Sequence, residues 1–111
     1  MIQDWMERFK AAWLSKDIDA VLALFTDDVE YWETPFQKMG KGIELSDAWG
    51  EILPLKNMEL EYDVFAMDLE KDRYAVKWKF SHSIGRSAGA YLIELDENGL
   101  CKYFYHSSQA V

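Results

Sequence analysis

The chain has 111 residues, of which 50% are hydrophobic and 15% aromatic, enough apolar material for the core of one domain over residues 1–111. Its net charge of −8 argues against a nucleic-acid partner and against anionic membrane surfaces. The single cysteine, Cys101, excludes an intramolecular disulfide and a cluster of thiolate metal ligands. No apolar run approaches the roughly 18 residues of a membrane span, and the charged N-terminus lacks a signal-peptide pattern, so we expect a cytoplasmic protein.

Two helices are predicted at the start of the chain. Apolar residues recur at helical spacing from Ile2 to Trp13, with charged residues on the opposite side. Asp17 is a suitable N-cap for a second helix, which the apolar residues predict to end at Phe25.

The next segment predicts a short strand, a loop and a third helix. Residues 29–34 are rich in β-forming side chains, and Pro35 holds the preceding residue in an extended conformation. Residues 37–42 predict a loop, and residues 43–53 can form a third helix.

The second half of the chain predicts four antiparallel strands joined by tight turns. A hairpin centred on Glu70 pairs opposite charges and apolar residues in one register, which is typical of a real hairpin. The pairs are Asp63 with Lys77, Glu61 with Lys79, Tyr62 with Trp78, and Leu60 with Phe80. A turn centred on Gly85 places Phe80 beside Ala90 and Trp78 beside Leu92.

The last turn contains Gly99, which suits the left-handed position of a three-residue loop. This register pairs Leu92 with Phe104 and Ala90 with His106. The alternation then divides the strand residues between two faces. One face carries Tyr62, Trp78, Phe80, His82, Ala88, Ala90, Phe104 and His106; the other carries Tyr91, Ile93, Leu95, Cys101, Tyr103 and Tyr105.

We expect the helices to cover the histidine-bearing face, with room for a pocket beside the small alanines. The other face would then bury its aromatic residues in a homodimer, through Tyr91, Ile93, Tyr103 and Tyr105. The alternative is a tyrosine-rich face that tolerates water through its hydroxyl groups.

Three segments of the chain resemble ketosteroid isomerases and SnoaL-like proteins of the NTF2-like superfamily: FKAAWLSKDIDAVLALFTDDVEYWETPF, GKGIELSDAWGEI and LDENGLCKYFYH. The order of the predicted elements is similar as well. The resemblance implies an α+β cone in which three N-terminal helices pack on a curved, mostly antiparallel sheet. It is specific for fold and weak for function, because this fold hosts isomerases, cyclases, hydrolases, dehydratases and non-enzymatic binders.

The resemblance also implies which catalytic positions this chain has lost. The aspartate general base of ketosteroid isomerases corresponds to Thr34, whose hydroxyl cannot act as a base near neutral pH. The two oxyanion-hole donors correspond to Phe9 and to a position near Ala88, neither of which has a donor. Steroid isomerisation by that mechanism is therefore excluded. The SnoaL-type acid/base corresponds to a position near His106, which keeps an ionisable group.

His106 is thus the candidate catalytic residue, because imidazole titrates near neutral pH. His82 shares its predicted face, so the two histidines could form a proton relay or bind a metal together with a carboxylate. The alternative is that both are structural histidines. The spacing contains no metal-binding motif, so we expect neither a metal nor a cofactor. The predicted ligand pocket consists of Phe9, Trp13, Trp32, Thr34, Trp49, Tyr62, Trp78, Phe80, His82, Ala88, Phe104 and His106.

Three functions remain open. The first is binding of a small apolar molecule in this pocket. The second is an isomerase, hydrolase or lyase that uses His106, with Thr34 or Tyr62 as hydrogen-bond partner, for proton transfer on a small carbonyl compound or epoxide. The third is a protein-interaction module that uses the outer sheet face.

Overall fold

The computed structural model describes residues 1–41 and 52–110. Within them the chain forms two helices and six strands, an α+β architecture. The elements are α1 (Ile2–Ser15), α2 (Ile18–Leu22), β1 (Phe25–Thr34), β2 (Gln37–Met39), β3 (Glu59–Asp68), β4 (Arg73–His82), β5 (Gly85–Leu95) and β6 (Cys101–Ala110). The third helix predicted over residues 43–53 falls almost entirely outside the described residues.

Helix α1 forms because its apolar residues recur every three or four positions and can all face the sheet. These residues are buried: Ile2, Trp5, Met6, Phe9 and Ala12. The helix ends at Lys16, which adopts the left-handed conformation (φ 58°), and the backbone N–H of Lys16 caps the last carbonyls.

Helix α2 begins as predicted, because the Asp17 side chain accepts a hydrogen bond from the backbone N–H of Ala20. Its predicted end at Phe25 is wrong, since the helix stops at Leu22 and Phe25 already belongs to β1. The predicted loop over residues 37–42 is also corrected, because Gln37–Met39 pairs with β1 as strand β2.

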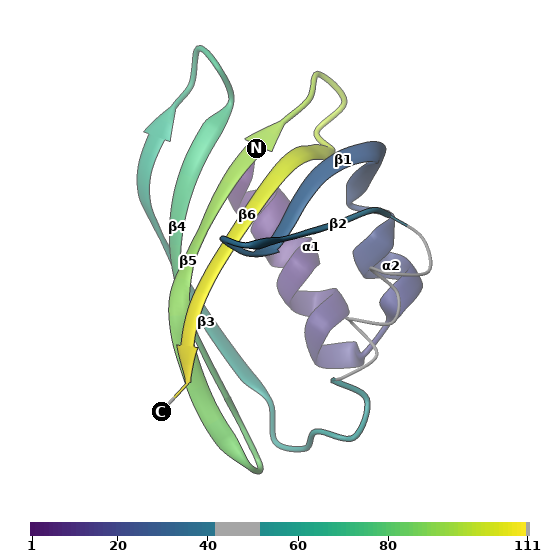
Figure 1. The fold of residues 1–111 in the computed structure, drawn as a ribbon, viewed down its shortest axis with the longest axis vertical. Helices are drawn as coiled ribbons and strands as arrows, with labels where there is room; N and C mark the ends of the chain where they lie inside the picture. The colour runs from purple at the N-terminus through teal and green to yellow at the C-terminus, as the bar shows by residue number, and fades with distance from the viewer. Residues whose placement is uncertain (42–51, 111) are drawn as a thin grey trace.

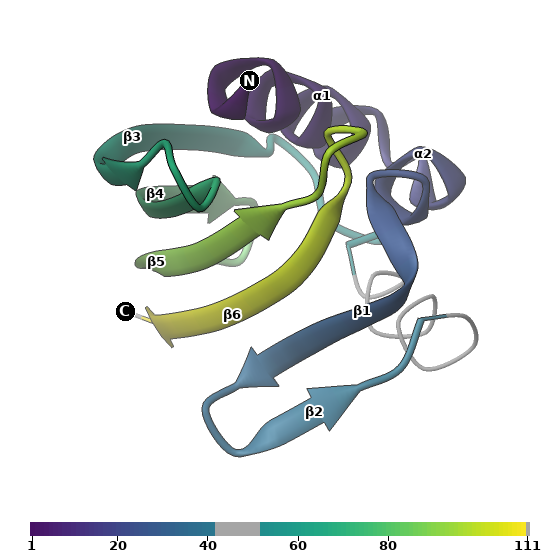
Figure 2. The same ribbon diagram turned by 90° about the horizontal axis from the view of Figure 1, so that it is seen from above.

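The six strands form one sheet in the order β2-β1-β6-β5-β4-β3. All neighbours are antiparallel except β1 and β6, which are parallel. Figures 1 and 2 show that the sheet is strongly curved and that α1 and α2 lie on its concave side. We call this concave side the inner face and the opposite side the outer face.

The hairpin β3–β4 has the predicted register, with Tyr62 opposite Trp78. The predicted register of β4 with β5 is wrong by three residues, because Trp78 lies opposite Gly89 and not Leu92. The physical reason is the turn: His82 pairs directly with Gly85, so that Gly85 begins β5 and is not the centre of the turn.

The register of β5 with β6 is wrong by one residue, since Phe104 pairs with Ile93 and not Leu92. Side chains alternate between the two faces of a strand, so an odd shift moves every β5 residue to the other face. Three β5 residues predicted for the outer face, Tyr91, Ile93 and Leu95, are consequently buried, each with 2% of its surface exposed. Cys101 of β6, also predicted for the outer face, is buried as well, where an irregularity in the β5–β6 register between Glu94 and Leu95 interrupts the alternation.

The core lies between α1 and the inner face and is unusually aromatic. Trp5 stacks on Phe9, and its indole N–H donates to the carbonyl of Leu24 at 3.0 Å. Tyr31 stacks on Phe104 with ring centroids 4.9 Å apart. In the part of the chain that the structure describes, no helix is long and apolar enough to cross a membrane.

Candidate functional site

A cavity of about 310 Å³ lies against the inner face of the sheet. It is bounded by the C-terminal part of α1, by parts of the strands β1, β4, β5 and β6, and by Ile52 and Leu55. Its wall consists of Trp13, Tyr31, Glu33, Ile52, Leu55, Trp78, Phe80, Ser87, Tyr91, Phe104, His106 and Ser108. The wall is therefore mainly aromatic, with a few polar groups that could orient a ligand.

His106 enters the cavity from β6, and its orientation is determined by the neighbouring strand β1. Its Nδ1 lies 2.9 Å from the backbone carbonyl oxygen of Glu33. A carbonyl oxygen can only accept a hydrogen bond, so Nδ1 carries the proton in this contact. In the neutral ring the lone pair is then on Nε2, which makes Nε2 a potential general base.

The surroundings of His106 favour this neutral ring. Trp78 and Tyr91 lie beside it, with ring centroids at 5.3 Å and 5.5 Å. Burial lowers the pKa of His106, because an imidazolium would lose its hydration, although the hydrogen bond to the Glu33 carbonyl acts in the opposite direction. At neutral pH the imidazole is thus available as a proton acceptor.

The Glu33 carboxylate lies close to the imidazole of His106. Its Oε1 lies 3.8 Å from His106 Nδ1, and about a third of its side chain is exposed. Burial raises the pKa of Tyr31, and the charge of the Glu33 carboxylate and a hydrogen bond to it raise that pKa further. Burial and the charge of Glu33 also raise the pKa of Tyr91. Both phenols remain protonated and can donate hydrogen bonds.

The segment that follows residues 42–51 is attached to the end of α1 by Lys16. The ammonium group of Lys16 donates to the carbonyl of Leu53 at 2.8 Å and also to the carbonyl of Leu55. Ile52 and Leu55 form one wall of the cavity. Lys16 is therefore a positioning residue for this wall.

Solved structures with the same arrangement exist at low sequence identity. An NTF2-like protein of unknown function from Exiguobacterium sp. superposes with a TM-score of 0.70 at 15% identity, over 95% of this chain and 98% of the other. No family model and no curated protein matches the sequence. The chain has the NTF2-like fold.

Two further NTF2-like neighbours are enzymes. SalBIII, an epoxide hydrolase/cyclase-like enzyme described with a role in pyran ring formation in the polyether salinomycin, has a TM-score of 0.81 at 9% identity, over 96% of this chain and 89% of its own. A Mycobacterium tuberculosis LEH-like epoxide hydrolase has a TM-score of 0.65 at 15% identity, over 96% of this chain and 80% of its own. At these identities the similarity establishes the fold alone.

Several residues predicted for the pocket lie in the wall of this NTF2-like cavity: Trp13, Trp78, Phe80, Phe104 and His106. Phe9 instead belongs to the core beneath it and is fully buried. The Tyr62 hydroxyl donates a hydrogen bond to a Glu7 carboxylate oxygen at 2.5 Å. Burial raises the pKa of Tyr62 most, and the hydrogen bond to Glu7 and the charge of Glu7 raise it further, to about 12. Tyr62 therefore links β3 to α1 outside the cavity. Trp49 is not among the described residues.

Four other predicted pocket residues are also placed elsewhere. Trp32 lies on the outer face, where its indole N–H donates to Glu30 at 2.9 Å. Thr34 is exposed, and its hydroxyl accepts the backbone N–H of Phe36. Ala88 lies opposite Lys79 on the outer face, because of the register shift. His82 packs against Phe80 near the end of β4 and does not line the cavity.

The sequence interpretation missed Glu33, Tyr31 and Tyr91. The predicted pocket includes Trp32 and Thr34, whose side chains have the opposite parity to that of Glu33 on the same strand. The apolar residues Val29 and Tyr31 share the parity of Glu33, and both are buried, so the alternation itself indicated the correct face. The cavity wall thus contains a carboxylate, Glu33, one residue before Thr34.

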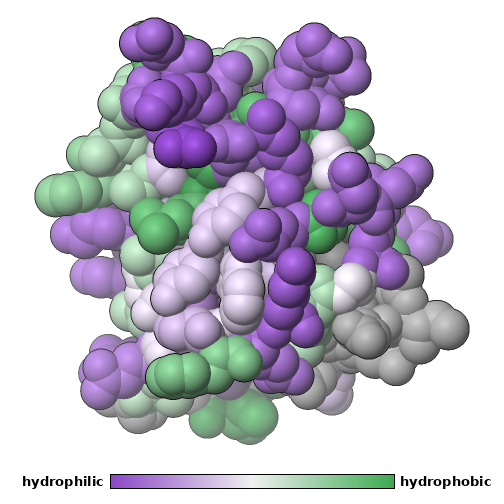
Figure 3. All heavy atoms as spheres, turned by 45° about the horizontal axis from the view of Figure 1, so that its top comes forward, coloured by the Kyte–Doolittle hydropathy of each residue, from purple (hydrophilic) through white to green (hydrophobic). Residues whose placement is uncertain are grey.

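The outer face offers a second surface. Leu92, Tyr103 and Tyr105 lie on neighbouring strands there, and 45% of Leu92 is exposed. A hollow of about 630 Å³ adjoins Leu92 and Tyr103. In Figure 3 weakly polar and apolar side chains, pale and green, gather in the middle of the view and hydrophilic ones border them. We call Leu92, Tyr103 and Tyr105 the outer strip.

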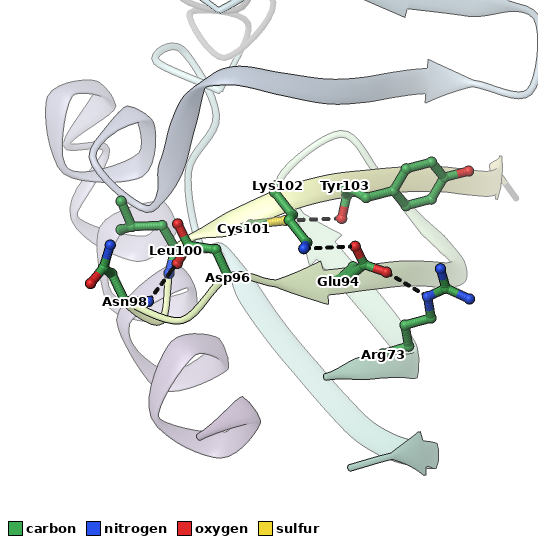
Figure 4. Close-up of polar contacts among 8 residues, drawn as sticks. All are labelled: Arg73, Glu94, Asp96, Asn98, Leu100, Cys101, Lys102 and Tyr103. Carbon is green, nitrogen blue, oxygen red and sulfur yellow. Dashed lines mark hydrogen bonds and ion pairs between the residues drawn. The ribbon is translucent and has the colours of Figure 1, made fainter. Parts of the chain in front are cut away.

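Charged residues border one end of the outer strip. Glu94 accepts from Arg73 Nε at 2.5 Å and lies 3.2 Å from Lys102 Nζ, as Figure 4 shows. The pKa of Glu94 is lowered, first by the hydrogen bond from Arg73. Arg73 and Lys102 thus neutralise Glu94, which is the only carboxylate that β5 contributes to the hollow.

Among the described residues, no group of three His, Cys, Asp or Glu side chains could hold a metal ion.

Proposed function

We propose that this protein binds a small, mainly apolar organic molecule in the inner cavity. The observation that supports it best is the cavity of about 310 Å³, whose aromatic wall also contains Glu33 and His106. Apolar cavities of this size with a few convergent polar groups are the usual form of small-molecule sites.

Filling the cavity tests this proposal. Ser108 is in the cavity wall, whereas Ser107 precedes it on β6 and faces outward beside Ala90. Compounds that remain bound after purification would be identified by mass spectrometry, and benzyl alcohol would be titrated as a neutral probe by NMR. We expect Ser108→Trp to abolish binding and Ser107→Trp to preserve it. Equal binding by both variants would contradict the proposal.

We propose as a second function that His106 acts as a general acid/base on the bound molecule. The specific observation in its favour is the hydrogen bond from Nδ1 to the Glu33 carbonyl, which leaves Nε2 as the proton acceptor. For an epoxide, Nε2 would take a proton from water while the water oxygen bonds to a ring carbon. The ring C–O bond breaks, and the resulting alkoxide takes a proton back from the imidazolium.

The two histidines of the chain separate this function from binding alone. Styrene oxide is a suitable small epoxide, and diol formation can be followed by chromatography. We expect His106→Ala to abolish turnover while the protein stays folded, and His82→Ala to retain it, because His82 does not line the cavity. Turnover that persists in His106→Ala would exclude His106 as the acid/base.

We propose a second copy of this chain as the partner of the outer strip. The support is its exposed apolar area and its charge pattern. Lys77 and Lys79 lie on one side of the strip, on β4, and Glu30 lies on the other side, on β1. A two-fold axis through the outer strip would bring Lys77 and Lys79 of each copy toward Glu30 of the other copy. Tyr91 and Ile93, predicted for this contact, are excluded because they are buried.

A further inference from the structure

Among the described residues, the inner cavity has one charged group in its wall, the Glu33 carboxylate. These residues place no lysine or arginine in the wall. An anionic ligand would thus meet a negative charge in a site of low polarity whose described wall supplies no cation, which is energetically costly.

His106 does not change this sign. Its Nδ1–H is used by the carbonyl of Glu33, and its other nitrogen presents a lone pair. Burial lowers the pKa of His106, so the ring is uncharged at neutral pH. A lone pair and a carboxylate together favour a ligand that brings hydrogen-bond donors and positive charge.

The aromatic wall has the same preference. The rings of Trp13, Trp78 and Tyr91 line the cavity, and Trp78 and Tyr91 are stacked with centroids 5.4 Å apart. The negative face of an indole or phenol ring attracts an alkylammonium group, and the attraction increases when water is excluded. The net charge of −8 of the whole chain would also concentrate cations near the molecule.

We propose that the cavity is selective for an organic cation: a protonated amine or a quaternary ammonium group carried on a small apolar body. The positive group lies beside the Glu33 carboxylate and the rings of Trp78 and Tyr91, and the apolar body occupies the remaining space between Trp13 and Phe104. This inference rests on the proposed binding function and names the chemical class of its ligand.

Three compounds of nearly the same shape test the proposal: benzylamine, benzyl alcohol and benzoate. Each would be titrated into the full chain at pH 7.5 by isothermal calorimetry. We expect benzylamine to bind at least about tenfold more tightly than benzyl alcohol, and benzoate not to bind measurably. Equal affinities for benzylamine and benzyl alcohol, or tighter binding of benzoate, would overturn the cation preference.

Variants of Glu33 then locate the preference. Glu33→Gln should reduce the tenfold difference between benzylamine and benzyl alcohol to the smaller part that the aromatic rings contribute, whereas Glu33→Asp should retain the full preference. Glu61→Gln, on the exposed outer side of β3, removes the same charge away from the cavity and should behave like the unaltered chain. A tenfold preference that is undiminished in Glu33→Gln would also overturn the proposal.

The binding function and the cation preference would fail in different ways. If none of the three compounds binds and Ser108→Trp has no effect on co-purifying molecules, the proposed binding function is wrong, and the cation preference with it. If benzyl alcohol binds as well as benzylamine, the binding function stands and only the cation preference is wrong.

Discussion

The two sides of strand β6 carry different chemistry on alternate residues. Phe104, His106 and Ser108 face the cavity, where the surroundings are aromatic and Glu33 is the one charged group among the described wall residues. Tyr103 and Tyr105 face outward, between the charged residues of β4 and β1. Two surfaces so close in sequence can be altered independently, provided that the strands keep their register. The following changes test that separation.

The largest effect is expected from Gly89, which holds β5 and β6 in register. A Cβ atom at this position would lie 1.8 Å from the carbonyl oxygen of Ser107, so β6 would have to move. We expect Gly89→Ala to destabilise the fold by roughly 3 kcal/mol and to impair both surfaces together. Urea unfolding measures this loss.

Gly85→Ala is the matched control, because its added Cβ would meet only His82, at 3.8 Å. Its stability should remain close to that of the unaltered chain. If the two variants unfold at the same urea concentration, the close approach at Gly89 is not required for the register.

The outer strip alone should respond to Leu92→Glu. A carboxylate in the middle of the strip would face its own copy across the proposed two-fold axis, so we expect the dimer to weaken by about tenfold or more. Sedimentation velocity measures this, and Ile84→Glu is the control, because Ile84 is 82% exposed in the turn between β4 and β5.

Benzyl alcohol binding should survive Leu92→Glu, since the side chain points away from the cavity. A dimer that persists in Leu92→Glu would place the interface elsewhere. A chain that is monomeric without any substitution would instead favour a different protein as partner of the outer strip.

Between pH 5 and 7.5, the inner side should control how the stability of the fold depends on pH. The pKa of His106 is lowered from 6.5 in the folded chain, so the unfolded chain binds protons more readily. The contribution of the neutral His106 to the free energy of unfolding is therefore fully present above pH 6.5, and it is lost as the pH falls through the lowered pKa. Urea unfolding between pH 5 and 7.5 should show this decrease.

The variant His106→Asn lacks the imidazole and should lose that part of the pH dependence, whereas Ser107→Ala, on the outer side, should keep it. An unchanged slope in His106→Asn would mean that other groups cause the acid sensitivity.

The smallest effect is expected from Lys16, which acts on the cavity only through its wall. Lys16→Met removes two hydrogen bonds to carbonyls but keeps the apolar stem, so we expect a loss of about 1 kcal/mol. The affinity for benzyl alcohol should decrease while the outer strip is unaffected. Unaltered affinity would show that the wall formed by Ile52 and Leu55 does not depend on Lys16.

Local patterns in the sequence determined several features of this protein. The spacing of apolar residues predicted α1, Asp17 predicted the start of α2, and the charge pairs predicted the register of β3 with β4. Gly99 does adopt a positive φ, of 80°. Each of these depends on residues that are near one another in the chain, so a short window of sequence contains the necessary information.

The tertiary structure decided what these patterns leave open. The parallel pairing of β1 with β6 joins segments more than 70 residues apart, and it places the Glu33 carbonyl at His106. The register of β5 depends on where a two-residue turn reverses the chain, and one odd step exchanges the inner and outer residues. Only the folded sheet therefore decided that Tyr91 faces the cavity and that Ala88 does not.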